Sequence, residues 1–230
     1  MDSYLVLKVF SVGFQATPTQ LSYYIQYSKK PSKKERTSIK AALSSTSIKD
    51  KGTLLAQLMK IGCFEQISIN KTDFDKYNIN LNFRQVSAYI KAEKIYPLSK
   101  AGKVFNAASY QEDLDPSMPL ILDVLEKNKS HPLLDDQTLL LSRNESLLLQ
   151  EALELLEMLK NNSIMVEYIQ YINKRGFVFY TQDKISIFIG DPPFQKKIAN
   201  LIALKQKTAK NNVKLTKIEL DFDGKAFIKE

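Results

Sequence analysis

Two side chains that often carry out chemistry, a cysteine and a histidine, each occur once in this chain of 230 residues. Cys63 lies between Gly62 and Phe64 at the end of an apolar helical pattern, where a small buried hydrophobe is the simplest interpretation. His131 precedes a proline in a polar stretch, which indicates a surface loop. Because the two residues fall in separate predicted domains, a Cys/His dyad is disfavoured. The usual zinc and Ser-His-Asp sites lack their parts.

Acidic and glycine-containing segments offer no stronger site. Three glutamates, Glu151, Glu154 and Glu157, lie on the solvent side or at the border of an apolar helix, and exposure explains them without catalysis. A glycine before a helix can bind phosphate, but in IGDPPF (189–194) an acid repels the anion and two prolines remove N–H donors. The sequence therefore predicts no enzyme, no cofactor and no metal site.

The charge of the chain permits several classes of partner. A net charge of +8 is compatible with an acidic protein, an anionic membrane surface or nucleic acid. The basic run from Lys29 to Arg36 resembles a phosphate-binding patch, although such a run is more often a solvated loop and first helical turn. No zinc ligands or glycine-aromatic signature point to nucleic-acid recognition. The most apolar segment, residues 4–14, is 11 residues long and contains a lysine, so no membrane span is predicted.

Helical and alternating patterns predict a first α/β region. A strand is expected at 21–28, a helix from Pro31-Ser32 to Leu43, and a short apolar helix at 53–62. Period-two alternation predicts three further segments of strand at 65–71, 76–83 and 87–98. The order is thus β-α-α-β-β with a terminal β addition, and a turn and short strand are expected at 100–106. A small, polar and acidic stretch with two prolines, 106–119, is the expected domain boundary.

A second region follows this boundary. Residues 145–162 predict an amphipathic helix, and a helix at 192–210 begins after Asp191 and two prolines. Between these helices, three strands are expected at 165–172, 176–181 and 184–190. Two helices and at least three strands predict a separate α/β domain.

The chain ends in a predicted hairpin, KIELDFDGKAFIKE (217–230). Residues 217–222 alternate, and Asp223-Gly224 suits a two-residue type I′ turn. Such a turn would place Leu220 opposite Phe227 and Phe222 opposite Lys225. The last strand, 225–229, either completes a core or leaves a sheet edge open to a partner.

Several motifs in this order resemble the FtsQ/DivIB family of bacterial cell-division proteins. The stretch GTLLAQLMKIGCFEQISIN…KYNINLNFRQVSAYI…YPLSKAGKVF is similar to the second half of the POTRA domain of that family. Ile189-Gly190, Phe194, Lys197 and Leu201 resemble its "L-G…K-L-x-x-L" segment, and 218–222 its "V-D-L-R-Y" strand. Matching positions in the POTRA stretch are Leu58, Phe64, Ile67, Ile79, Leu81, Arg84, Ala88, Gly102, Val104 and Phe105.

The resemblance implies an α+β fold, in which a β-α-α-β-β POTRA domain precedes a β domain with an antiparallel or mixed sheet and flanking helices. The expected divisions are an N-terminal lead-in, 1–20; the POTRA-like domain, 21–106; a linker, 107–119; and the β domain, 120–230.

The resemblance also implies a function. Members are non-enzymatic scaffolds of the divisome that bind FtsB/DivIC-like and FtsL-like proteins. They cross the cell (inner) membrane once, through an N-terminal helix that is not predicted within these 230 residues. The chain is therefore expected on the extracytoplasmic or periplasmic side, without a nucleic-acid partner.

Strand addition at the C-terminal hairpin is the expected mode of partner binding. The residues expected to bind are Phe222, Lys225, Ala226, Phe227, Ile228 and Lys229. Two alternatives remain open from the sequence: another POTRA-bearing factor for envelope assembly or secretion, and a basic nucleic-acid-binding α/β protein. The first should show further POTRA repeats or a barrel, and the second an affinity that falls steeply with salt.

Overall fold

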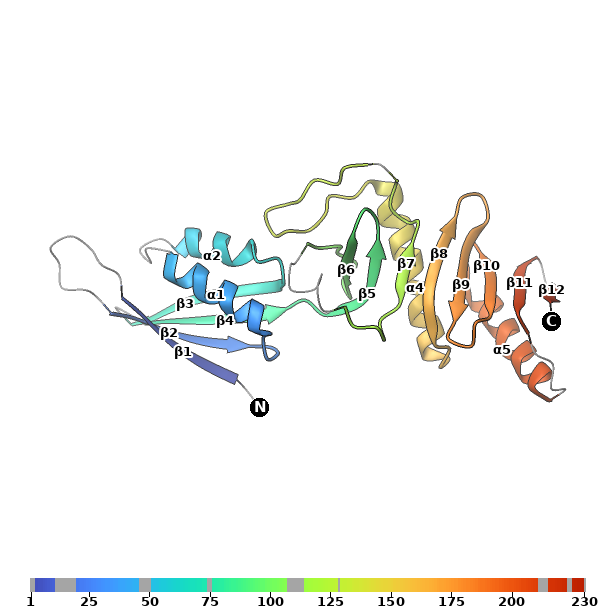
Figure 1. Ribbon diagram of the computed structural model, residues 1–230, viewed down its shortest axis with the longest axis horizontal. Coiled ribbons are helices and arrows are strands. Elements are labelled where there is room, and N and C mark those ends of the chain that lie inside the picture. Colours follow the sequence, from blue (N-terminus) through green and yellow to red (C-terminus); the bar gives the residue numbers. More distant parts are fainter. Residues whose placement is uncertain are drawn as a thin grey trace. The chain divides into compact units, whose positions relative to one another are not determined.

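A computed structural model describes residues 3–10, 20–45, 51–73, 76–106, 114–127, 129–210, 215–222 and 225–229. The described residues form four helices and two mixed sheets, which confirms the predicted α+β class (Figure 1). The chain divides into two compact units. Unit 1 comprises Met1–Val86, Lys103–Leu114 and Pro132–Leu140, and unit 2 comprises Ser87–Gly102, Asp115–His131 and Leu141–Glu230.

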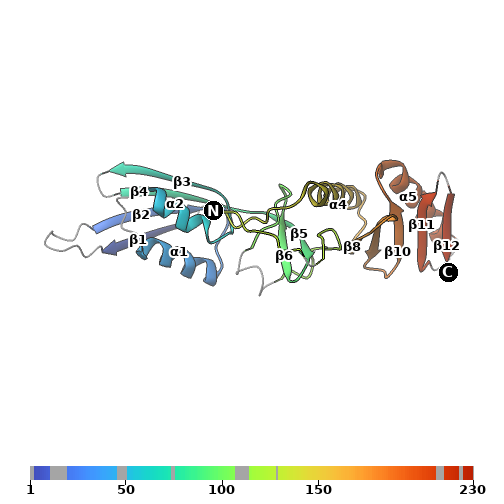
Figure 2. The same ribbon diagram turned by 90° about the horizontal axis from the view of Figure 1, so that it is seen from above.

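Unit 1 is a four-stranded sheet in the order β1-β2-β4-β3, with two helices on one face (Figures 1 and 2). Its β2-α1-α2-β3-β4 sequence has the expected β-α-α-β-β order. β2 and β4 are parallel, and the other two pairs are antiparallel. The element bounds are β1 (Ser3–Phe10), β2 (Gln20–Tyr27), α1 (Lys33–Ser45), α2 (Lys51–Met59), β3 (Phe64–Asp73) and β4 (Lys76–Phe83).

The core of unit 1 follows from the side-chain periods of strands, two residues, and of α-helices, 3.6 residues. Along β2, Tyr23 and Ile25 are buried while Tyr24 is exposed, as the period of two requires. Along α1, Glu35, Ile39 and Leu43 are buried at steps of four residues and face the sheet. Residues 3–10 form β1, although the sequence pattern predicts only a lead-in there. β1 pairs with β2 along its whole length, from Ser3 opposite Tyr27 to Phe10 opposite Gln20.

Unit 2 is built on an eight-stranded sheet in the order β12-β11-β10-β9-β8-β7-β5-β6. Its helices are α4 (Arg143–Asn161) and α5 (Gln195–Lys210). Their buried apolar stripes include Leu149, Leu155 and Leu201. The strands are β5 (Val86–Lys91), β6 (Ile95–Ser99), β7 (Leu120–Leu122), β8 (Val166–Ile172), β9 (Gly176–Thr181), β10 (Ser186–Gly190), β11 (Lys217–Phe222) and β12 (Lys225–Lys229).

The segment 87–98 departs from the expected layout. It forms two strands, because the Ala92 N–H donates to the Lys94 carbonyl and closes a turn between β5 and β6. β5 then pairs in parallel with β7, so both strands join the eight-stranded sheet instead of the sheet of unit 1. The compact units accordingly change at Val86/Ser87, within the 21–106 range predicted for the first domain. In the expected linker 107–119, residues 107–113 lie outside the described residues.

Arg84 is the most buried basic side chain described in unit 1. Its Nη2 lies 2.8 Å from Asp136 Oδ2, and its Nη1 donates to the Gly62 carbonyl at 3.1 Å. The guanidinium also lies 5.0 Å from the centre of the Phe105 ring and pairs at 3.7 Å with Glu65. Arg84 thus joins segments of unit 1 that are far apart in the sequence.

Candidate functional site

The C-terminal hairpin contains a bulge that its sequence pattern does not predict. Phe222 lies opposite Lys225, as expected. Glu219, and not Leu220, lies opposite Phe227, so the predicted Leu220–Phe227 pair is wrong. Two residues of β11 separate these pairs but only Ala226 separates them on β12, which leaves one extra residue in β11. The predicted turn residues, Asp223-Gly224, lie outside the described residues.

The bulge changes which face of the sheet Phe227 occupies. A slip of one residue moves a side chain to the other face. Phe227 therefore shares a face with Glu219 and is 54% exposed, whereas Ile218 and Leu220 are buried. Ile228 is 45% exposed on the opposite face. Apolar side chains are consequently exposed on both faces of β12.

The six residues expected to bind a partner all lie on or beside this strand. Ile228 is opposite Ile218, and Lys229 is opposite Lys217. The side chains of four of them lie outside the described part of the structure: Phe222, Lys225, Ala226 and Lys229.

The two edges of the eight-stranded sheet differ. β6 contains Pro97, which has no N–H to donate, and its residues Pro97, Leu98 and Ser99 are buried. β12 contains no proline, and within the described residues β11 is its neighbour in the sheet. Edge strands are normally protected by proline, charge or cover. β12 has a lysine at each end, Lys225 and Lys229, but the three residues between them are apolar. β12 is therefore the edge of this sheet that is better suited to accept another strand.

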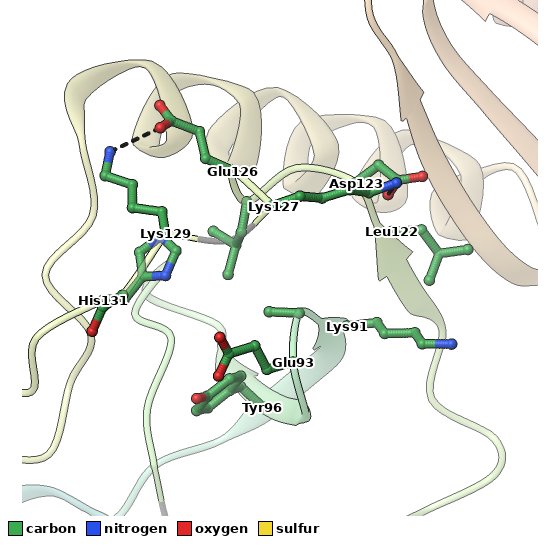
Figure 3. Close-up of a pocket in the computed structure, with 12 residues that line it drawn as sticks. Lys91, Glu93, Tyr96, Leu122, Asp123, Glu126, Lys127, Lys129 and His131 are labelled. Atoms are coloured by element: carbon green, nitrogen blue, oxygen red, sulfur yellow. Dashed lines mark ion pairs between the residues drawn. The ribbon is translucent and has the colours of Figure 1, made fainter.

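A cavity of about 550 Å³ is the second candidate (Figure 3). It lies where β5 and β7 end. The residues that line it are Lys91, Ala92, Glu93, Tyr96, Leu122, Asp123, Leu125, Glu126, Lys127, Lys129, Ser130 and His131. Open sheets commonly bind ligands at the carboxyl ends of parallel strands. Two of its lysines are already paired, however: Lys127 with Asp123 at 3.0 Å and Lys129 with Glu126 at 3.1 Å. These charges neutralise one another and form no nucleophile–base arrangement.

Glu145 holds two residues that line this cavity, Glu126 and His131, in place. Its side chain is fully buried and completes a capping box with Ser142 at the start of α4. One oxygen accepts the Ser142 N–H at 2.8 Å; the other accepts the Glu126 N–H at 2.9 Å and lies 2.7 Å from His131 Nε2. Glu145 thereby ties the loop 126–131 to the helix.

His131 is not the surface residue that the sequence indicated. Its side chain is 7% exposed and lies against Glu145. The expectation failed because the partner is 14 residues away and no local pattern reports it. Cys63 is fully buried, and burial, reinforced by the charge of Glu35, raises the pKa of its thiol to about 12. A thiol with this pKa is a poor nucleophile. Within the described residues, no group of three or more His, Cys, Asp or Glu side chains could hold a metal ion.

Glu145 should make stability depend on pH. Burial alone would raise its pKa, but hydrogen bonds from Glu126, His131 and Ser142 outweigh burial and lower the pKa to about 2. A depressed carboxyl pKa stabilises the fold above the unfolded value of 4.5, and this stability is lost as the pH falls towards 2. The difference in urea midpoint between the wild type and Glu145→Gln should therefore shrink from pH 4.5 to pH 2.

Glu151→Gln is the control for this measurement. The pKa of Glu151 is raised by burial and by the charges of Asp191 and Glu154. Removing its charge should increase stability at neutral pH, the opposite sign to Glu145→Gln. A Glu145→Gln difference that stayed constant from pH 4.5 to pH 2 would contradict the assigned role of the Glu145 charge.

Comparison with known protein families finds a match. A family model described as "Cell division protein FtsQ/DivIB, C-terminal" matches residues 88–221, more than half of the chain. The match begins next to Ser87, where unit 2 begins, and ends in β11, so β12 lies beyond it. No curated protein matches the chain.

Proposed function

The chain belongs to the FtsQ/DivIB family of cell-division proteins, and from this we propose that it is a non-enzymatic divisome scaffold whose β12 edge receives a strand from a partner. The family implies a role in complexes of cell-division proteins. The proposed partners are FtsB/DivIC-like and FtsL-like proteins.

The state of the β12 edge is the observation that carries this proposal. Strand addition uses main-chain hydrogen bonds for affinity and side chains on both faces for selectivity. β12 supplies a proline-free edge, with Phe227 exposed on one face and Ile228 on the other. Side chains of an added strand would flank the edge on both faces and cover these two residues, which removes apolar surface from water.

The place of action is also part of the proposal. The family suggests a membrane-anchored protein with this part outside the cytoplasm. None of the helices in the described residues combines the length and apolar character needed to cross a membrane. An anchor would hold the β12 edge near membrane-bound partners and raise their effective concentration.

Proline substitutions at the β12 edge test the proposal. The extra residue of the bulge lies in β11, so alternation along β12 is undisturbed. If the Phe222–Lys225 pair is the hydrogen-bonded pair of a two-residue hairpin, the N–H groups of Ala226 and Ile228 point away from β11. Ala226→Pro or Ile228→Pro should then remove one edge donor, spare the hairpin and weaken partner binding roughly tenfold or more. Isothermal titration with the extracytoplasmic part of the FtsB/DivIC-type partner measures this effect.

Two controls make this test decisive. Leu147→Ala, at an exposed leucine of α4, should bind like the wild type. Thermal unfolding identifies which proline variants keep the fold, and Phe227→Ala offers a milder change should both prolines unfold the hairpin. Wild-type affinity in every folded β12 variant would place the interface elsewhere.

A further inference from the structure

The surface around the start of α1 is strongly basic and has no part in the proposed strand addition. Six exposed basic side chains lie between residues 29 and 40. We call them the basic face: Lys29, Lys30, Lys33, Lys34, Arg36 and Lys40.

The one acidic side chain within this segment, Glu35, is buried. Glu35 is buried at 3% exposure, and one of its oxygens accepts the Ser32 N–H at 2.6 Å. The Glu35 N–H in turn lies 3.2 Å from Ser32 Oγ, which completes a capping box. The other carboxylate oxygen of Glu35 lies 3.9 Å from Lys29 Nζ. The one carboxylate between residues 29 and 40 therefore serves the fold, and the surface that water meets is cationic.

The distribution of charge along α1 is electrostatically unfavourable by itself. Lys33, Lys34 and Arg36 lie in its first turns, whereas its last turn has no basic residue. The helix dipole favours cations at the opposite end. An anionic surface against this end of the unit would offset the repulsion, so the charge complementarity points to a polyanionic partner.

We propose that the basic face docks on anionic phospholipid headgroups of the membrane. Each Lys or Arg near an anionic bilayer strengthens binding about fivefold, and clusters of four to eight are effective. Residues 29–40 contain no aromatic side chain on which nucleic-acid bases could stack. The inference rests on the proposed function, because only a membrane anchor would hold the basic face near a bilayer.

Vesicle binding tests the inference. The chain should co-sediment with vesicles of phosphatidylglycerol and phosphatidylethanolamine but not with pure phosphatidylcholine, and raising the salt concentration should release it. A variant with glutamine at Lys30, Lys33, Arg36 and Lys40 should bind at least thirtyfold more weakly. A control variant with the same loss of charge on α5 should bind like the wild type; its glutamines replace Lys196, Lys205, Lys207 and Lys210.

Several outcomes would overturn the inference. One is equal loss of vesicle binding in both variants, which would reflect net charge alone. Another is absence of vesicle binding by the wild type at low salt, including the case where duplex DNA binds through the basic face. Titration with the FtsB/DivIC-type partner without lipid separates this test from the proposed scaffold, because the basic-face variant should retain that binding.

Discussion

Replacing Arg84 by methionine is expected to lower the free energy of unfolding by about 3–5 kcal/mol, the usual cost of removing one partner from a buried ion pair. The change leaves Asp136 without its 2.8 Å partner and the Gly62 carbonyl without a donor. Burial raises the pKa of Asp136, but hydrogen bonds from Thr138 and the Arg84 charge outweigh it and lower that pKa. Urea unfolding followed by circular dichroism measures the loss.

Two further variants separate this ion pair from a general loss of positive charge. Arg143→Met, at an exposed arginine of α4, should stay within about 0.5 kcal/mol of the wild type. Arg84→Met combined with Asp136→Asn should recover part of the loss, because the Asp136 charge that had lost its partner is removed as well. Wild-type stability of Arg84→Met alone would show that the pair does not support unit 1.

Gly176→Ala is expected to cost about 3–5 kcal/mol, the sum of backbone strain and overpacking. Gly176 has φ +73°, which alanine adopts poorly. A Cβ at this position would also lie 2.3 Å from the carbonyl carbon of Gly190 and 2.5 Å from the Asp191 nitrogen. Both neighbours are backbone atoms, so neither can move aside as a side chain would.

Gly102→Ala is a control that keeps the unfavourable backbone conformation but has no steric clash, so it separates these two contributions to the loss of stability. Gly102 has φ +78°, but the nearest atom to a Cβ there is Leu153 Cδ1 at 3.7 Å, an ordinary contact. This variant should therefore cost only about 1–2 kcal/mol. Equal losses in the two glycine variants would show that the close approach of Gly176 to Gly190 does not matter.

The helices were predictable from the sequence because they carry long, regular signals. The helical spacing of apolar residues predicted α4 within two residues of its observed bounds. Pro31-Ser32 predicted the start of α1. β7 was missed because three residues give too short a pattern. β1 was missed because it is apolar at successive positions, so its sequence has no period of two. The alternation of 87–98 was recognised, but which sheet it joins depends on β7, a partner distant in sequence.

The candidate site was predictable in part. Period-two alternation and the turn residues located the hairpin, and the pairing of Phe222 with Lys225 was expected. The bulge in β11 was not, because its sequence alternates without interruption and carries no glycine. The role of Glu145 could have been found from the Ser-x-x-Glu signature at Ser142, but its contact with His131 depends on the tertiary fold.

The division of the chain into units has a consequence for how such a protein can be recombined. The chain passes from one unit to the other after Val86, Gly102, Leu114, His131 and Leu140. A single cut at any of these points leaves one unit without segments of its own, such as the loop that brings Asp136 to Arg84. Gene fusion at one junction therefore cannot separate one unit from every segment of the other. We expect the two to be inherited together, as one module in evolution and in protein engineering.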